Sequence, residues 1–279
     1  MTAAARPAGL PDCPRCAGHG YVVRPGPEAA EAAVCECVPP CPLCQGTGFR
    51  VVEGREGLIA GRCRCRVLPD RVAMFNRAGI PARHAASTFE SFNLKRNPGA
   101  RGAFTASRAW LRSWRPGEEN RGLVLTGPVG RGKTHLLAAI LHHLVIEHGV
   151  EVRFVEFTHL LSTLKSGFDE GIGEAVTLQP LVRVPVLAID ELGKGRATEW
   201  ELAIVDSLVS RRYNALATVL ATTNFRAVGP TGVLEGNLAD PDKAPSLGDR
   251  VGERVFSRLR EMCQFVPVGG DDYRCLVTL

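Results

Sequence analysis

The chain has 279 residues, of which 45% are apolar and 23% are charged, a composition typical of globular proteins with about two domains. No run of about 18 apolar residues and no secretory leader pattern occurs, so we expect a cytoplasmic protein without a membrane partner. The formal net charge is +5, and it would be about four units lower if two sets of four thiolates each held one Zn²⁺ ion. Net charge therefore excludes neither nucleic acid nor protein as a partner.

A cysteine pattern is duplicated near the amino terminus, after a Pro- and Ala-rich stretch at residues 1–12 that we expect to be disordered. CPRCAGHGYVV is echoed by CPLCQGTGFRVV, and each copy continues to a C-x-C pair, so each reads C-x₂-C-x₁₈-C-x-C. Four soft ligands per copy are enough for one tetrahedral zinc site. The expected ligands are Cys13, Cys16, Cys35 and Cys37 in the first copy, and Cys41, Cys44, Cys63 and Cys65 in the second.

The glycines after the first pair of each copy, Gly18 and Gly20 and then Gly46 and Gly48, allow backbone N–H groups to turn back onto the sulfurs. Disulfides and an iron–sulfur cluster are the competing interpretations, and a reducing compartment favours zinc over disulfides. The CPxCxGxG element resembles the cysteine-rich repeats of DnaJ co-chaperones, whose ligand pairs combine out of order. Pairing in this chain is accordingly open, either sequential or interleaved.

Three domains are predicted: a zinc-binding module at 1–66, a linker with a helical lead-in at 67–120, and a nucleotide domain at 121–279. The short module buries little apolar area, so bound metal is expected to supply its folding energy. Its role is then either recognition of a partner or simple support of the nucleotide domain. Within the linker, Val67–Arg77 and Phe104–Trp114 read as helices.

The run RGLVLTGPVGRGKTH has the form of a buried strand, a glycine loop and a helix start. Gly127, Gly132, Lys133 and Thr134 fill the fixed positions of G-x-x-x-x-G-K-[ST]. Such a loop aims backbone N–H groups at phosphate, while the Lys reaches the β- and γ-phosphates and the Thr hydroxyl binds Mg²⁺. The expected nucleotide-binding residues are Gly127, Pro128, Val129, Gly130, Arg131, Gly132, Lys133, Thr134 and His135.

Strands and helices then alternate, as in an α/β protein with a parallel sheet. Four further strands are predicted at 150–157, 186–189, 218–221 and 264–268. Asp190 and Glu191 follow the strand at 186–189, where Asp190 would hold Mg²⁺ and Glu191 would activate the attacking water. Asn224, after the next strand, could hold the same water. A helix-capping acidic turn and an ordinary turn Asn are the plain alternatives.

The segment 246–262 is predicted to be one helix that places Arg250, Arg254 and Arg258 on one face at four-residue spacing. These arginines form either a solvated basic face or an arginine finger that reaches the nucleotide of a neighbouring subunit. Residues 226–248, which are rich in Gly, Pro and Asp, read as an extended loop.

From about residue 66 onward the chain resembles the AAA+ ATPases of the DnaC/DnaI helicase-loader family, with IstB-type transposition helpers as relatives. The motifs that carry the resemblance are AGIPARH, STFESF, GPVGRGKTH, LAIDELG, ATTNF, SLGDRVGERVFSRL and DDYR. The resemblance implies an AAA+ P-loop NTPase fold with a five-stranded parallel sheet, preceded here by a small zinc-binding domain.

The same resemblance implies roles for individual residues. Lys133 and Thr134 match the Walker A motif, and Asp190 and Glu191 match the Walker B motif. Asn224 matches the sensor 1 residue, and Arg274 matches a sensor-2-like arginine that would contact the nucleotide. Arg258, with Arg254 beside it, matches the arginine finger that acts on a neighbouring subunit. His159 and Lys165 lie on the helix that contacts single-stranded DNA in family members.

We therefore predict an ATP-dependent loader that uses ATP, Mg²⁺ and Zn²⁺ and binds a replicative helicase and single-stranded DNA. ATP would be hydrolysed at interfaces between copies of the chain, which would assemble on ATP and DNA. The alternative is an IstB-like helper ATPase for transposition or phage recombination, with a transposase as its partner. A chaperone-type zinc adaptor with an inactive ATPase is disfavoured by the intact Lys133, Glu191 and Asn224.

Overall fold

The computed structural model describes residues 9–54, 57–171, 173–227 and 245–273. Arg274, residues 1–8 of the predicted disordered terminus and most of the predicted loop at 226–248 lie outside this set. The chain forms two compact units, Met1–Ala86 with Val145–Gly149, and Ser87–Leu144 with Val150–Leu279. This division into compact units does not test the three predicted domains at 1–66, 67–120 and 121–279, which stay a prediction.

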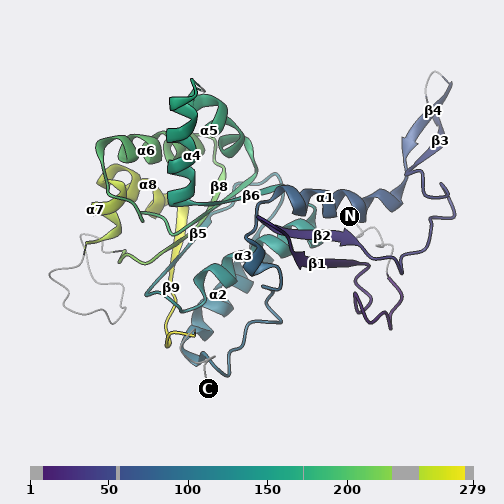
Figure 1. Cartoon of the computed structure of the whole chain (residues 1–279), viewed down its shortest axis with the longest axis horizontal. Helices are drawn as coiled ribbons and strands as arrows, with labels where there is room; N and C mark the ends of the chain where they lie inside the picture. The colour runs from purple at the N-terminus through teal and green to yellow at the C-terminus, as the bar shows by residue number, and fades with distance from the viewer. Residues whose placement is uncertain (1–8, 55–56, 172, 228–244, 274–279) are drawn as a thin grey trace. The chain divides into compact units, whose positions relative to one another are not determined.

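Two small antiparallel hairpins and one helix build the amino-terminal unit (Figure 1). Its elements are β1 (Tyr21–Pro25), β2 (Ala30–Val34), β3 (Phe49–Gly54), β4 (Gly57–Arg62) and α1 (Val67–Arg77), with 3₁₀ turns at Arg64–Arg66 and Ala82–His84. The two hairpins have the same register, because the pair Tyr21–Val34 in the first corresponds to Phe49–Arg62 in the second. The duplication in the sequence is therefore a duplication of structure.

Helix α1 forms where the sequence predicted a helix, and it packs against β2. Leu68, Val72 and Phe75 recur at helical spacing and are buried. The Asn76 side chain accepts a hydrogen bond from the Ala32 N–H at 2.6 Å and donates one to the Ala32 carbonyl at 3.0 Å. Apolar packing and this amide together fix the helix on the first hairpin.

The second unit, Ser87–Leu144 with Val150–Leu279, contains the predicted nucleotide-binding loop and is called the nucleotide unit for that reason. It is an α/β fold whose sheet has strand order β6-β7-β8-β5-β9 within the described residues. All four pairings in this sheet are parallel, which confirms the predicted five-stranded parallel sheet. Its strands are β5 (Gly122–Thr126), β6 (Val152–Glu156), β7 (Val186–Asp190), β8 (Thr218–Thr223) and β9 (Cys263–Pro267). Its helices are α2 (Arg101–Ser113), α3 (Lys133–His143), α4 (Phe157–Asp169), α5 (Glu174–Arg183), α6 (Glu199–Asn214), α7 (Leu247–Val251) and α8 (Glu253–Met262). A 3₁₀ turn at Pro98–Ala100 precedes α2, and a π-helical turn at Leu144–His148 follows α3.

Helices cover both faces of this sheet, with α2 and α3 on one side and α4, α5, α6 and α8 on the other (Figure 1). The central strands are buried along their whole length, which explains their continuous apolar runs in the sequence. Neighbouring strand residues divide between the two cores, since side chains alternate across a sheet. Among the described residues, no helix combines the length and apolar character that crossing a membrane requires.

The predicted single helix over 246–262 is wrong. Gly252 adopts a φ of 86° and separates α7 from α8, and Ser246 and Asp249 form a capping box at the start of α7. Arg250 therefore belongs to a different helix from Arg254 and Arg258, so these arginines do not form one continuous helical face.

Candidate functional site

The predicted phosphate-binding loop lies between β5 and α3, at the carboxyl edge of the sheet. Gly127, Gly130 and Gly132 have φ angles of 137°, 79° and 87°, a region that favours glycine. The ammonium group of Lys133 donates hydrogen bonds to the carbonyls of Gly127 at 2.7 Å and Pro128 at 2.6 Å. Lys133 is thus buried and folded back over the loop, and a phosphate placed there would compete with those carbonyls for its charge.

Neighbouring segments pack closely against the same loop. A Cβ atom on Gly132 would lie 2.8 Å from the Phe92 ring, and one on Gly130 would lie 1.9 Å from Asp272 Oδ1. The Tyr273 N–H donates to the Gly130 carbonyl at 2.9 Å. The loop is consequently supported by residues far away in the sequence, and larger side chains at its glycines would force these segments apart.

Thr134 and Asp190 are 56 positions apart in the chain and meet in the structure. The Thr134 hydroxyl lies 3.0 Å from Asp190 Oδ1 and 3.2 Å from Oδ2, and the Thr222 hydroxyl donates to Oδ1 at 2.6 Å. Burial raises the pKa of Asp190, while the hydrogen bonds from Thr222 and Thr134 act against that rise. A divalent cation at this carboxylate would relieve the same burial cost, so Thr134 and Asp190 fit a Mg²⁺ site.

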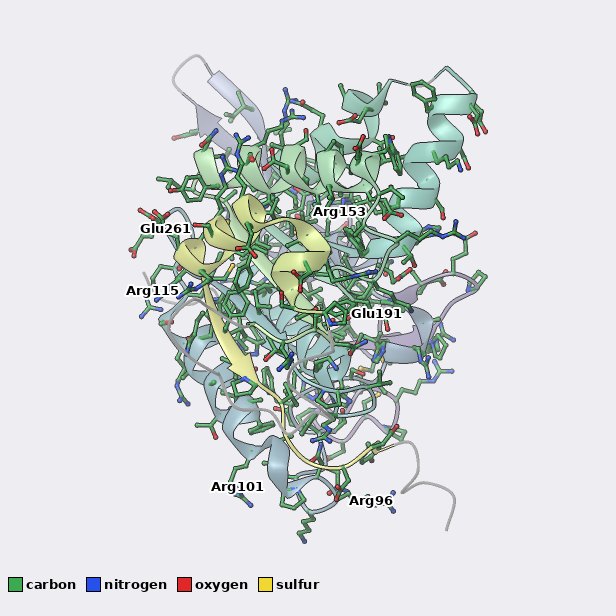
Figure 2. All side chains as sticks on the ribbon, turned by 90° about the vertical axis from the view of Figure 1, so that its left-hand side faces the viewer. Arg96, Arg101, Arg115, Arg153, Glu191 and Glu261 are labelled. Carbon is green, nitrogen blue, oxygen red and sulfur yellow. The ribbon has the colours of Figure 1, made fainter. Side chains whose placement is uncertain are left out.

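Glu191 directly follows β7 and is labelled in Figure 2. Its backbone has a φ of 55°, and its N–H donates to the Thr222 hydroxyl at 2.9 Å. Non-glycine residues rarely adopt this left-handed conformation, which is common at functional sites. The carboxylate forms an ion pair with Lys194 that raises the pKa of the Lys194 ammonium. The carboxylate end of Glu191 is thus held by an exposed surface cation, and not by the buried core.

His135 connects the start of α3 to the segment that follows Ala86. Its Nε2 atom lies 2.9 Å from the Thr88 carbonyl and 3.3 Å from the Ser91 hydroxyl, and its ring meets Phe92 edge-on at 5.1 Å. Burial lowers the pKa of His135. A neutral His135 with these partners is part of the packing at the end of the loop.

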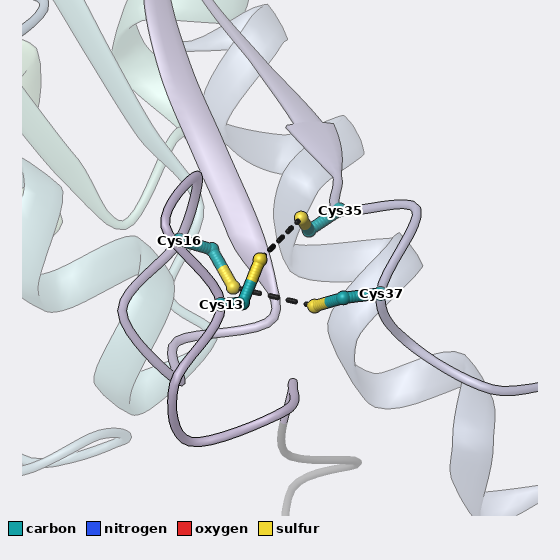
Figure 3. A group of neighbouring side chains, drawn as sticks. All are labelled: Cys13, Cys16, Cys35 and Cys37. Atoms are coloured by element: carbon teal, nitrogen blue, oxygen red, sulfur yellow. Dashed lines mark hydrogen bonds between the residues drawn. The ribbon is translucent and has the colours of Figure 1, made fainter.

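The eight cysteines of the two copies form two clusters in sequential order, so each copy closes on itself. Within each cluster the four Sγ atoms lie within 4.8 Å of one another. Figure 3 shows the first cluster, with Cys13, Cys16, Cys35 and Cys37 turned toward one another. The closest sulfur pairs are Cys13–Cys35 at 3.8 Å, Cys16–Cys37 at 3.4 Å, Cys41–Cys63 at 3.7 Å and Cys44–Cys65 at 3.4 Å. A tetrahedral zinc site with Zn–S bonds of about 2.3 Å requires sulfurs about 3.8 Å apart. Both clusters fit that requirement.

Backbone N–H groups turn onto one sulfur of each cluster, as the glycine positions predicted. Gly20 donates to Cys16 Sγ at 3.4 Å, and Gly48 donates to Cys44 Sγ at 3.3 Å. Burial opposes ionisation of Cys44, but the N–H of Gly48 and the Cys65 thiol lower its pKa to about 6. The Cys16 N–H likewise lowers the pKa of Cys13 to about 7. Burial raises the pKa of Cys37 to about 12, and the hydrogen bond with Cys44 raises that of Cys65 to about 12, so each cluster has one thiol that ionises readily and one that a bound metal would have to deprotonate.

A family model described as "IstB-like ATP binding protein" matches residues 70–277, which is more than half of the chain. The chain belongs to this family. The replicative helicase loader DnaC of Escherichia coli (strain K12) is 28% identical over 207 residues, spanning 73% of this chain and 76% of DnaC. A crystal structure of the DnaC helicase loader superposes with a TM-score of 0.57 at 27% identity, covering 67% of this chain and 99% of that one.

A crystal structure of DnaI shares the fold, with a TM-score of 0.52 at 20% identity over 70% of this chain and 94% of that one. AMPPCP-bound DnaA from Aquifex aeolicus does so too, with a TM-score of 0.51 at 17% identity over 67% of this chain and 52% of that one. The predicted family and the AAA+ P-loop NTPase fold are thereby confirmed. The roles of the individual site residues stay predictions.

In this IstB-like chain the remaining predicted residues are dispersed. Asn224 is half-buried directly after β8, beside the other strand ends. Arg258 donates to Asp206 of the same chain at 2.9 Å, whereas Arg254 is 75% exposed and lies 3.9 Å from that carboxylate. His159 and Lys165 are positioned on α4, and Lys165 is exposed there. Arg274 lies outside the described residues.

One residue that the sequence analysis did not select, Thr222, contributes to the site, and one that it selected for another role, Arg250, does so too. Thr222 contacts Asp190, the last residue of β7, and Glu191, which follows it. The only signal for Thr222 in the sequence was its place in the ATTN run. Arg250, treated as part of the finger region, donates from Nε to the Gly193 carbonyl at 3.1 Å and from its guanidinium to the Gly195 carbonyl. Arg250 therefore ties α7 to the loop that follows Glu191.

Proposed function

We propose that this chain is an ATP-dependent loader of a replicative helicase. The observation that carries the ATPase part is the contact of Thr134 with Asp190, which joins the phosphate loop to the acidic end of β7. The likeness to the DnaC helicase loader over most of both chains supports the loader part.

In this proposal Lys133 neutralises charge on the transferred phosphate. Thr134 and Asp190 would hold a Mg²⁺ ion, which would supply electrostatic stabilisation of the phosphates. Glu191 exchanges Lys194 for the attacking water and accepts its proton, and Asn224 orients that water from the neighbouring strand. Hydrolysis of ATP to ADP then shifts the chain away from the assembled state, because ATP and ADP favour different assembly states.

Arg258 is proposed to complete the site of a neighbouring copy. In the single chain its guanidinium is occupied by Asp206 and lies 5.9 Å from the Tyr213 ring centre. Assembly would exchange that internal partner for the phosphate of a neighbour, with the more exposed Arg254 beside it. An exchange of this kind keeps the finger inactive in the monomer.

The amino-terminal unit is proposed to hold two Zn²⁺ ions and to grip the helicase. Single-stranded DNA is proposed to lie along α4, which carries His159 and Lys165. A helper ATPase with a transposase as its partner is the second candidate, because the ATPase region resembles IstB-type transposition helpers and matches the IstB-like family model.

The test replaces Lys133 with Ala and measures ATP turnover with and without single-stranded DNA, followed by helicase loading onto a DNA circle. We expect turnover and loading both to be lost. Unchanged turnover would refute the site. Capture of a transposase in place of the helicase by the unaltered chain would favour the second candidate.

A further inference from the structure

The second hairpin carries an exposed apolar face, on which the Arg66 guanidinium lies over the Phe49 ring at 5.1 Å from its centre. Because opposed residues of an antiparallel pair point to the same side, Phe49, Val51, Leu58 and Ala60 share one face of β3 and β4. Phe49 is 45% exposed, Val51 70% and Leu58 74%, and Ala60 is exposed too. We call these four residues the open face. Exposed apolar side chains gathered on one small surface are typical of an interaction site.

The first hairpin shows how the same face is covered. An offset of 28 positions, as between Cys13 and Cys41, relates the copies, so Tyr21, Ala30 and Ala32 correspond to Phe49, Leu58 and Ala60 of the open face. Val23, which is half-buried, corresponds to Val51. Tyr21 is 9% exposed, Ala30 1% and Ala32 6%. The covering helix is α1, which lies against β2 (Figure 1). The segment after it also contacts the hairpin, and the Ala30 N–H donates to the Ile80 carbonyl at 2.7 Å.

The covering helix has a simple chemistry. It presents Leu68, Val72 and Phe75 at i, i+4 and i+7, and its Asn76 amide bonds both backbone groups of Ala32. A helix of this kind combines apolar burial with recognition of a strand edge. The equivalent strand edge on the second hairpin is at Ala60.

We propose that the open face binds an amphipathic helix of the replicative helicase, in the way that α1 covers the first hairpin. This rests on the proposed function and adds to it the surface and the kind of element recognised. A second copy of the chain is a poorer occupant, because its own α1 already covers its first hairpin through Phe75 and Asn76. Two charged residues, Glu53 and Arg62, point to the same side of the hairpin as the open face. They lie at its two ends and leave its centre apolar.

The test uses the full chain loaded with zinc and the purified helicase from the same source. Val51→Glu and Leu58→Glu place a charge on the open face. Ile59→Glu is the matched control, since Ile59 is 55% exposed but points to the opposite side of the same hairpin. Zinc content, thermal unfolding and ATP turnover are measured for each variant, and all are expected to match the unaltered chain.

We expect helicase affinity to fall at least about tenfold in V51E and L58E and to change less than about threefold in I59E. Equal binding by all variants would overturn the assignment of the face and leave the loader function standing. Equal loss in all three would overturn it as well, because the effect would then be a general one of charge. A loss of self-association without loss of helicase binding would make a second copy the occupant. Failure of the unaltered chain to bind helicase would instead refute the proposed function.

Discussion

Thr222 offers the sharpest test of how the two acidic residues are held. The change Thr222→Val keeps the shape of the side chain and removes its hydroxyl. In the structure that hydroxyl donates to Asp190 at 2.6 Å and accepts the N–H of Glu191 at 2.9 Å, and Thr222 is 1% exposed. One substitution therefore removes a bond from each acidic residue, and no bulk water can replace either bond.

The size of the effect follows from the type of bond. A hydrogen bond to a charged group contributes about 1.5–3 kcal/mol, and about 1.36 kcal/mol corresponds to a tenfold change in rate. If the lost bond stabilises only the reactive arrangement, turnover by T222V falls roughly 10- to 100-fold. Because the Thr222 bond opposes the rise in pKa of Asp190, its loss raises that pKa further, and the acid side of the pH–rate profile moves to higher pH.

Steady-state ATP turnover from about pH 5 to 9 measures both effects, with thermal unfolding as a check on folding. Thr218→Val is the matched control, since Thr218 is a buried threonine at the other end of the same strand. Turnover by T222V within about twofold of T218V, with an unchanged acid limb, would refute the role given to the hydroxyl.

Three other changes have definite expected outcomes. Arg212→Met should lower the free energy of unfolding by about 3 kcal/mol or more, because the fully buried guanidinium donates to five backbone carbonyls. Denaturant unfolding measures this loss, and Arg211→Met, the control, should lower the free energy of unfolding far less. Metal analysis should find two Zn²⁺ per chain, and a chelator should unfold the amino-terminal unit before the nucleotide unit melts, as far-UV circular dichroism would record. Asp206→Ala should free Arg258 and raise turnover at low protein concentration severalfold if assembly limits it, and a sedimentation run should show more oligomer.

The sheet and the phosphate loop were predictable because their information is local. The central strands β5, β7 and β8 each contain a short apolar run, and the glycine loop with Lys133 and Thr134 lies within eight residues of β5. The Thr222 contacts were not predictable in this way. They depend on β8 lying between β5 and β7, where Leu125 pairs with Thr222. No local pattern records that order of strands.

The break at Gly252 was missed for a different reason. Leu247, Val251, Val255 and Leu259 recur every four residues and are all buried, so the apolar period continues across the break. Periodicity alone therefore favours one helix, while the left-handed backbone of Gly252 redirects the chain between two helices. The redirected α7 brings Arg250 to the loop after Glu191.

The two cysteine copies share some structural features because their sequences are duplicated, and differ in others. Zinc-ligand spacing and hairpin register are internal to each copy, and both are repeated. The helix that covers a hairpin does not belong to either copy. The described part of the chain has one such helix, α1, which follows the second copy in sequence but packs against the first hairpin. The small side chains of Ala30 and Ala32 let a helix approach β2 closely, whereas Leu58 occupies the position that corresponds to Ala30. A helix on the open face would therefore have to pack around Leu58, and so would lie farther from β4 than α1 lies from β2.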